Sequence, residues 1–262
     1  MWDFEHGTVG QKFDISYTVP SACARSLAAG TADIGIIPAA AYTQIPGLQV
    51  LPDVAIASKQ AVRSILLVSR KPIRDVRTIA LDTSSMTSVA LTRILFEKWL
   101  GGAREYVSLD PDLGKMLEKC DAGLLIGDPA LQVDRSRYHT LDLAEEWIRH
   151  TGKPFVFAFW AVRADALSEA DPSVDLAAVF RDSRDHGLQS ANLDAIVDEW
   201  APRLRLHANE VRSYLTVNIH YKFDAACHEG LRLFFQLGTQ IGALPSAPEL
   251  AFANQSHIAV KA

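Results

Sequence analysis

Short apolar runs alternate with amphipathic segments along the chain, which is the pattern of a parallel or mixed sheet flanked by helices. The apolar runs are almost continuous, so we expect strands that are buried on both faces. The expected strands are residues 13–19, 33–37, 64–69, 78–81, 105–109, 123–126 and 155–162. This alternation predicts the α/β fold class.

The expected helices lie between these runs and dominate the chain after about residue 164. The clearest is 86–100, where leucines and a tryptophan share one face and two glycines follow the last turn. Pro20 and Gly30 mark the start and the end of another helix. The remaining expected helices are 112–120, 143–150, 174–184, 193–204, 210–217 and 225–241.

This order of elements predicts two lobes. A chain that is β/α at first and helical at its end leaves one lobe, builds a second and returns to the first. The apolar strands 64–69 and 155–162 bracket the middle segment and are the expected crossovers. The predicted division is a discontinuous first lobe of residues 1–68 and 164–262 and an inserted α/β lobe of residues 69–163.

Composition narrows the classes of function. With 262 residues, 48% of them hydrophobic, the chain has enough apolar surface to fill two cores. Its 26 Lys and Arg and 31 Asp and Glu are mixed along the chain, and no basic run could follow a phosphate backbone. We therefore expect no nucleic-acid partner. The longest strongly apolar stretch, 154–162, is shorter than the about 20 residues that a membrane span needs, so no membrane association is expected.

Cysteine usage and the first residues predict a cytoplasmic protein. Cys23, Cys120 and Cys227 stand far apart, without a C-x-x-C pair or a histidine at a metal-ligand spacing. They are typical of reduced structural cysteines, and we expect no bound metal. The residues from Met1 to His6 are polar and acidic and lack the apolar core of a signal peptide, so export is not expected.

The segment most informative for function is 79–91, in which an apolar strand passes through a hydroxyl-rich turn into a helix. Free backbone N–H groups and the positive end of the helix dipole attract an anion at such a helix start. Ser84, Ser85, Thr87 and Ser88 would add uncharged donors for a carboxylate or phosphate. One serine there would also suffice as an ordinary helix cap. Four hydroxyl groups in five positions favour ligand binding.

Two further loops follow apolar strands and are expected to face the same cleft, because ligands of open α/β sheets bind beyond the carboxyl ends of strands. One loop contains Ala39, and the other contains Gly127 and Asp128. An Asp before a proline also starts turns and caps helices, so Asp128 has an ordinary structural interpretation as well. Tyr221, in a polar patch after a helix, could reach a cleft, although support of the core is the favoured interpretation.

The chain lacks the common nucleotide and hydrolase motifs. It contains no G-x-G-x-x-G, no G-x-x-x-x-G-K-[ST] and no G-x-S-x-G sequence. A nicotinamide cofactor, a nucleotide phosphate and a serine-hydrolase nucleophile therefore have no support. The simplest hypothesis is a site without a cofactor.

Several segments, in this order, resemble the chorismate dehydratases of the futalosine route to menaquinone. They are Leu51–Ser58, Val62–Leu67, Ala80–Ser88, Leu125–Leu131, Gly152–Ala161, Tyr214–Leu215 and His220–Tyr221. The resemblance implies a type II periplasmic-binding-protein fold without export, with two mixed sheets flanked by helices and chorismate in the cleft. It also implies a carbon-oxygen lyase that converts chorismate to 3-[(1-carboxyvinyl)oxy]benzoate, as a monomer or homodimer. Ser84, Ser85, Thr87 and Ser88 would then bind one carboxylate.

Members of this family begin with a strand and an Asn-x-x-Pro-like turn whose Asn belongs to the catalytic site. The expectation is that this strand and its Asn precede the equivalent of Met1, so the catalytic residue is not assigned. Two alternatives stay open. One is a non-catalytic protein that binds a small carboxylate, and the other is the sister enzyme of the same route. That enzyme acts on a cyclic futalosine derivative and relies on a cleft histidine, for which His139 and His150 are the candidates.

Overall fold

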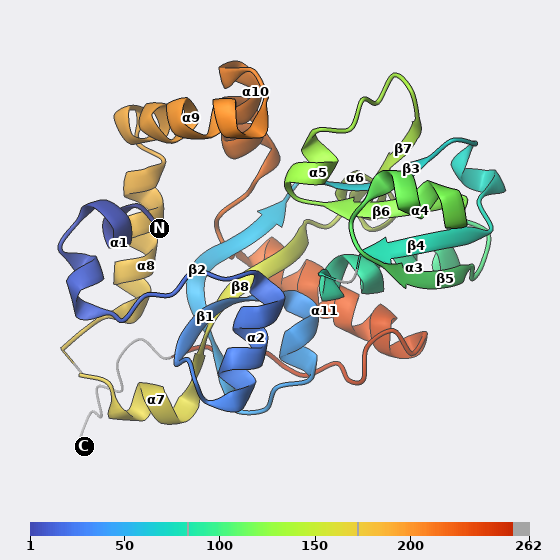
Figure 1. Cartoon of the computed structure of the whole chain (residues 1–262). Coiled ribbons are helices and arrows are strands. Elements are labelled where there is room, and N and C mark those ends of the chain that lie inside the picture. Colours follow the sequence, from blue (N-terminus) through green and yellow to red (C-terminus); the bar gives the residue numbers. More distant parts are fainter. Residues whose placement is uncertain (83, 172, 254–262) are drawn as a thin grey trace.

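Two β-sheets, one in each lobe, organise the described residues, which are 1–82, 84–171 and 173–253 of the computed structural model (Figure 1). The first sheet has the order β1-β8-β2, formed by Ile34–Pro38, Phe155–Arg163 and Leu48–Ser58. Both outer strands pair antiparallel with β8. An isolated parallel bridge between Val50 and Phe252 attaches the segment after the last helix to β2.

The second sheet is mixed and has the order β5-β4-β6-β3-β7. β4 runs parallel to β5 and β6, whereas β3 runs antiparallel to β6 and β7. The carboxyl ends of β4, β5 and β6 therefore share one edge of the sheet. These strands are β3 Ile65–Ser69, β4 Thr78–Asp82, β5 Glu105–Leu109, β6 Ala122–Ile126 and β7 His139–Asp142.

Helices cover both sheets. In the second lobe they are α3 Met86–Lys98, α4 Leu113–Lys119, α5 Asp128–Leu131 and α6 Leu143–Thr151. Those of the first lobe are α1 Trp2–His6, α2 Pro20–Ala29, α7 Ala164–Glu169, α8 Leu176–Gly187, α9 Ser190–Leu204, α10 Ala208–Ser213 and α11 Ala225–Gln240. Figure 1 shows α8, α9 and α10 rising beside the first sheet, while α11 runs beneath the junction of the lobes.

One hydrophobic core runs from lobe to lobe. It includes leucines of α3 in the second lobe and phenylalanines of α11 in the first. Trp147 of α6 lies edge-on to Phe155 of β8 at 5.3 Å between ring centroids, and Phe155 contacts Phe234 of α11 at 5.1 Å. Burial of this many large side chains stabilises the contact between the lobes, because each one contributes about 1.5–3 kcal/mol.

Most predicted elements are present, and the α/β class is confirmed. Helix α2 begins at Pro20 and ends at Gly30, whose φ of 69° is the left-handed conformation that favours glycine. The strand expected at 13–19 is wrong, because the segment pairs with no strand in the described chain. Phe13 and Ile15 pack against a core cluster, but Tyr17 and Val19 are 73% and 56% exposed, so the run is not buried along its length.

The sheets change over at positions that differ from the predicted lobe boundaries. The predicted first lobe ends at residue 68, yet β3 pairs in the second sheet. The predicted second lobe ends at residue 163, yet β8 is the central strand of the first sheet. The chain therefore passes between the sheets in residues 59–64 and again in residues 143–154. Both strands are strongly apolar, which indicates that they lie near a crossover. The apolar pattern does not show which of the two sheets each strand joins.

Candidate functional site

The hydroxyl-rich turn lies where the two lobes meet. It connects β4 to α3, and α3 packs against the short helical turn Ala39–Thr43 that follows β1. The Oγ1 atom of Thr87 accepts a hydrogen bond from the backbone N–H of Ala40 at 3.1 Å. It also donates one to the carbonyl oxygen of Phe157 in β8 at 3.1 Å. The Thr87 side chain therefore links the start of α3 to two elements of the first lobe.

Two other hydroxyl groups of the turn are used within the turn itself. Ser85 is the N-cap of α3, and its side chain accepts a hydrogen bond from the N–H of Ser88 at 3.2 Å. Ser84 donates from both its backbone N–H and its hydroxyl to Oδ1 of Asp82, at 2.8 and 2.6 Å. These bonds fix the shape of the turn. They leave the Ser88 hydroxyl, for which no hydrogen bond to another described residue is found, and the first N–H groups of the helix.

Asp82 ends β4 and places a carboxylate beside this turn. The residue is 1% exposed, and its Oδ2 atom has no hydrogen-bond partner among the described residues. No ion pair to Asp82 is found there either. A buried carboxylate oxygen without a hydrogen-bond partner lowers the stability of the folded protein. The junction between the lobes therefore contains a polar atom that the other described residues do not satisfy.

The structure brings Ala39 to this turn and places Gly127 and Asp128 against the crossover between the lobes. Ala39 is fully buried and precedes Ala40, the partner of Thr87. Gly127 is the N-cap of α5 with a φ of 64°, and its N–H donates to the carbonyl of Ser64 at 2.8 Å. Asp128 is exposed and is the first residue of α5.

The tyrosine Tyr214 extends this crossover contact. Its hydroxyl donates to Oγ of Ser64 at 3.0 Å. Burial is the main cause that raises the pKa of Tyr214, and the nearby charge of Asp128 raises it further. Asp128 therefore lies close enough to Tyr214 to influence its hydroxyl, which binds the same residue, Ser64, as Gly127.

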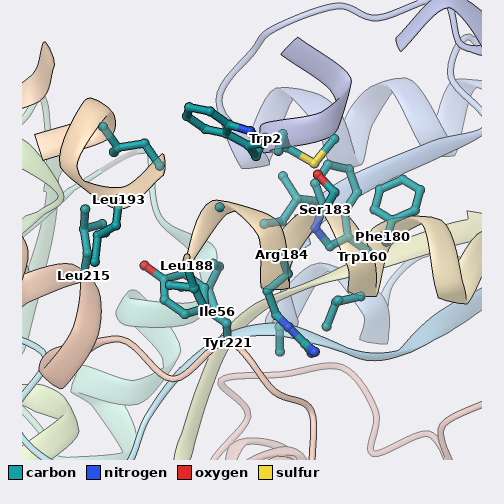
Figure 2. A pocket seen from close by; sticks show the side chains of 16 residues that line it. Trp2, Ile56, Trp160, Phe180, Ser183, Arg184, Leu188, Leu193, Leu215 and Tyr221 are labelled. Carbon is teal, nitrogen blue, oxygen red and sulfur yellow. The ribbon is translucent and has the colours of Figure 1, made fainter. Parts of the chain in front are cut away.

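A cavity of 230 Å³ opens in the first lobe, and its walls are mostly apolar (Figure 2). All three strands of the first sheet contribute, through Ile36, Ile56 and Trp160. Other wall residues come from α1, from α8 and its C-terminal end, from α9 and from the segment after α10: Trp2, Phe180, Ser183, Arg184, Leu188, Leu193, Leu215 and Tyr221. None of the seven residues predicted from the sequence lines this cavity. Tyr221, for which core support was favoured, does line it.

A cluster of titratable groups lies beside the end of β2, at the start of α11. Asp224 caps α11 by accepting from the N–H of Cys227, and it pairs with Lys59 at 2.6 Å and His220 at 3.1 Å. Burial alone would raise the pKa of Asp224, but these hydrogen bonds outweigh it and lower the pKa well below its usual value. Burial raises the pKa of the Cys227 thiol to about 12.

His220, Asp224 and Cys227 have ligand atoms within 4.8 Å of one another. The donor types suit zinc, which binds nitrogen, oxygen and thiolate ligands. However, Lys59 already places a positive charge on Asp224, and the thiol is held in its neutral form. These groups therefore fit a helix cap with an ion pair.

Comparison with solved structures shows the class of fold. A protein of Archaeoglobus fulgidus, AF1704, has a TM-score of 0.67 at 18% identity, with 92% of this chain and 93% of that chain covered. The periplasmic aliphatic sulphonate binding protein SsuA of Escherichia coli has a TM-score of 0.63 at 14% identity, with 95% and 86% covered. The chain thus has the periplasmic-binding-protein-like α/β fold that the sequence predicts.

Comparison of sequences shows the family. The model of the menaquinone biosynthesis family matches residues 1–240, and the chain belongs to this family. Over 255 residues it is 30% identical to a chorismate dehydratase of Thermus thermophilus, with 90% of this chain and 89% of the relative covered. The resemblance that the sequence motifs indicate is confirmed. Among the described helices, none is both long and apolar enough to cross a membrane.

Sequence reasoning missed the role of Thr87 as a link between the lobes. From the motif alone, Thr87 is predicted to be a ligand donor. A hydroxyl at a helix start can donate to a ligand or to the protein, and the motif does not distinguish the two. Its partners Ala40 and Phe157 lie 47 and 70 residues away along the chain, so no local pattern indicates them. The apolar cavity also had no signal, since its walls come from segments that are far apart along the chain.

Proposed function

We propose that this protein removes water from chorismate to give 3-[(1-carboxyvinyl)oxy]benzoate, as a cytoplasmic enzyme of menaquinone biosynthesis that needs no cofactor. The observation that carries the proposal is the 30% identity to a chorismate dehydratase along 90% of the chain. The position of the α3 start supports it, because this helix start contacts Ala40 and Phe157 of the first lobe, and small-molecule sites occur preferentially at such domain interfaces.

The chemistry suits a site with few reactive groups. Loss of the ring C3 proton and cleavage of the C4–O bond release one water and leave an aromatic ring. Aromatisation supplies a large driving force that is already present in the substrate. The tasks of the protein are to orient the ring, to exclude water and to hold two carboxylates, which positioned donors and dipoles do well.

The hydrogen bonds divide the predicted site residues into two groups. Ser84, Ser85 and Thr87 hold the turn in shape, while Ser88 and the N–H groups of Met86 and Thr87 are the donors we assign to one substrate carboxylate. Ala39 precedes Ala40, the partner of Thr87, and Gly127 with Asp128 follows β6, at the sheet edge where β4 also ends. The group that removes the C3 proton is not assigned.

A non-catalytic binding protein is the second candidate, because SsuA shares the fold and binds aliphatic sulphonates. The sister enzyme of the pathway has less support. His150 stacks on Trp99 at 4.8 Å and hydrogen-bonds Glu146, so its ring is engaged in α6 packing, and His139 is exposed on the edge strand β7.

Incubation of the purified protein with chorismate, followed by absorbance of the aromatic product, tests the proposal. We expect product to accumulate catalytically and the melting temperature to rise with chorismate. A rise in melting temperature without product would favour the binding protein. Absence of both effects would reject chorismate as the ligand.

A further inference from the structure

The residues that line the cavity of Figure 2 suit a ligand that contains a ring. Trp160 and Phe180 form part of its surface, together with the aliphatic side chains Ile36, Ile56 and Leu193. Its volume of 230 Å³ is below the about 300–1,000 Å³ of most ligand cavities. A compact ring compound therefore suits it better than a long chain or a nucleotide.

Two polar side chains in the wall, Ser183 and Arg184, already have partners within the protein. Oγ of Ser183 accepts a hydrogen bond from the N–H of Asp3 at 3.1 Å. The guanidinium of Arg184 donates to the carboxylate of Asp185 at 2.7 Å and to the carbonyl of Asp53. Figure 2 shows this guanidinium directed away from Trp2.

Tyr221 differs from these two residues. Its hydroxyl makes no hydrogen bond to another described residue, and Figure 2 shows the oxygen on the side of Leu215, another wall residue. The neighbouring Tyr214 hydroxyl, in contrast, is bound to Ser64. Among the side-chain hydroxyl and guanidinium groups of the described cavity wall, the Tyr221 hydroxyl is thus the one left for a guest, beside the indole N–H groups of Trp2 and Trp160.

The backbone holds Tyr221 firmly in this position. Its carbonyl accepts from the N–H of Ala55, and the preceding residue His220 forms an antiparallel bridge with Ala57 of β2. Burial, together with the nearby Tyr214, raises the pKa of Tyr221, so the phenol stays a hydrogen-bond donor throughout the neutral range. A fixed, uncharged donor in an apolar wall fixes the orientation of a ligand. Because the donor carries no charge, it does not attract anions in general.

We propose that Tyr221 is a specificity-determining residue, which donates a hydrogen bond to an oxygen acceptor of a cyclic carboxylate whose ring lies in the cavity between β1, β2, β8 and α8. With the proposed function, on which this inference rests, the cyclic carboxylate is chorismate. The strand β1 leads from the cavity wall at Ile36 to Ala40, the residue bound to Thr87, within four residues. The cavity wall at Ile36 and the contact with α3 at Ala40 are therefore close along the same segment of the chain.

Two conservative variants test the inference, each lacking one phenolic oxygen. Tyr221→Phe removes the unpartnered hydroxyl, and the matched control Tyr214→Phe removes the hydroxyl that Ser64 engages. The measurements are the Kd of chorismate by calorimetry, KM and kcat for its dehydration, and the melting temperature of each variant. We expect Tyr221→Phe to raise Kd and KM about tenfold or more, since a hydrogen bond to a charged acceptor is lost. Its melting temperature should stay close to that of the parent.

Tyr214→Phe should change Kd and KM by less than about twofold. Unchanged chorismate binding in Tyr221→Phe, or equal weakening of binding in both variants, would overturn the role of Tyr221. The proposed function would still stand in that case, provided that the parent protein dehydrates chorismate. If the parent neither binds nor dehydrates chorismate, the proposed function fails, and the assignment of Tyr221 fails with it.

Discussion

The hydroxyl of Thr87 in the second lobe accepts a hydrogen bond from the backbone N–H of Ala40 in the first, at 3.1 Å. The same oxygen donates to the carbonyl of Phe157. Thr87 is 2% exposed, so water does not replace these bonds when the side chain is altered. One side chain thus satisfies two backbone groups of the opposite lobe.

Thr87→Val keeps the shape of the side chain and removes both hydrogen bonds. It leaves the buried Ala40 N–H and Phe157 carbonyl unpaired, so the free energy of unfolding should fall by about 2–3 kcal/mol. Thr87→Ser retains the hydroxyl and should cost clearly less. Denaturant titration of the three proteins checks this, and equal stability of the Val and Thr proteins would show that the link is not formed in solution.

Substitution of Ser85 should affect mainly stability, whereas substitution of Ser88 should affect mainly chorismate binding. Ser85 caps α3, so Ser85→Ala should lower the free energy of unfolding by about 1 kcal/mol. Ser88→Ala should leave stability almost unchanged and should weaken chorismate binding, because we assign its hydroxyl to the ligand. Thermal melts and calorimetric titration of both variants provide the comparison. A loss of stability in Ser88→Ala with intact binding would contradict the assignment.

Asp142 controls the first crossover. Its buried carboxylate accepts hydrogen bonds from the N–H groups of Val62, Arg63, Ala144 and Glu145, at 2.6 to 3.2 Å. Arg63 has a φ of 67°, a left-handed conformation that is unfavourable for a residue with a Cβ, and these bonds help to hold it.

Asp142→Ala would leave all four donors without this acceptor. We expect a loss of about 3 kcal/mol or more in the free energy of unfolding, and a smaller loss in Asp142→Asn, which keeps one acceptor oxygen. Denaturant unfolding of both variants measures the difference. Equal losses in the two would indicate that the carboxylate acts by volume alone.

The Asp224 cluster predicts a specific acid sensitivity. Hydrogen bonds from Lys59, Cys227 and His220 lower the pKa of this carboxyl in the folded protein, against the opposite effect of burial. A depressed pKa gives stability that is present above the unfolded pKa of about 4 and is lost as the pH falls toward the folded value. Stability should therefore fall from about pH 4 downward.

Asp224→Asn should reduce this dependence, because the asparagine does not titrate. Unfolding measured at several pH values between about 2 and 6 gives both slopes. His220, whose pKa burial lowers, acts in the same direction, so His220→Gln is the control for its share. If the free energy of unfolding changes with pH equally in the parent and in Asp224→Asn, the proposed effect of the Asp224 cluster is contradicted.

The sequence predicted those elements whose stability is decided locally or by continuous burial. Strands β4 and β6 are fully apolar in their centres, and α3 carries its cap and its amphipathic pattern within itself. In contrast, β2 was not predicted, because Pro52 and Asp53 interrupt it. Asp53 has a φ of 65°, and the register with β8 shifts between Val50 and Ala55, so a bulge accommodates both residues.

The short strand β7 also had no signal in the sequence. It consists of His139, Thr140, Leu141 and Asp142 at the edge of the second sheet, where polar residues are tolerated on a strand. For the site, the sequence indicated the right turn but not what its hydroxyls contact. Partners such as Asp82 for Ser84 and Ala40 for Thr87 follow from tertiary packing, which periodicity does not encode.

The central claim is that this chain dehydrates chorismate, and proton magnetic resonance of the reaction mixture tests it most directly. We expect the ring signals of chorismate to be replaced by those of a meta-substituted benzoate, with the methylene signals of the enolpyruvyl group retained. Chorismate that stays unchanged with folded protein, or an aromatic product that has lost the enolpyruvyl group, would contradict the claim.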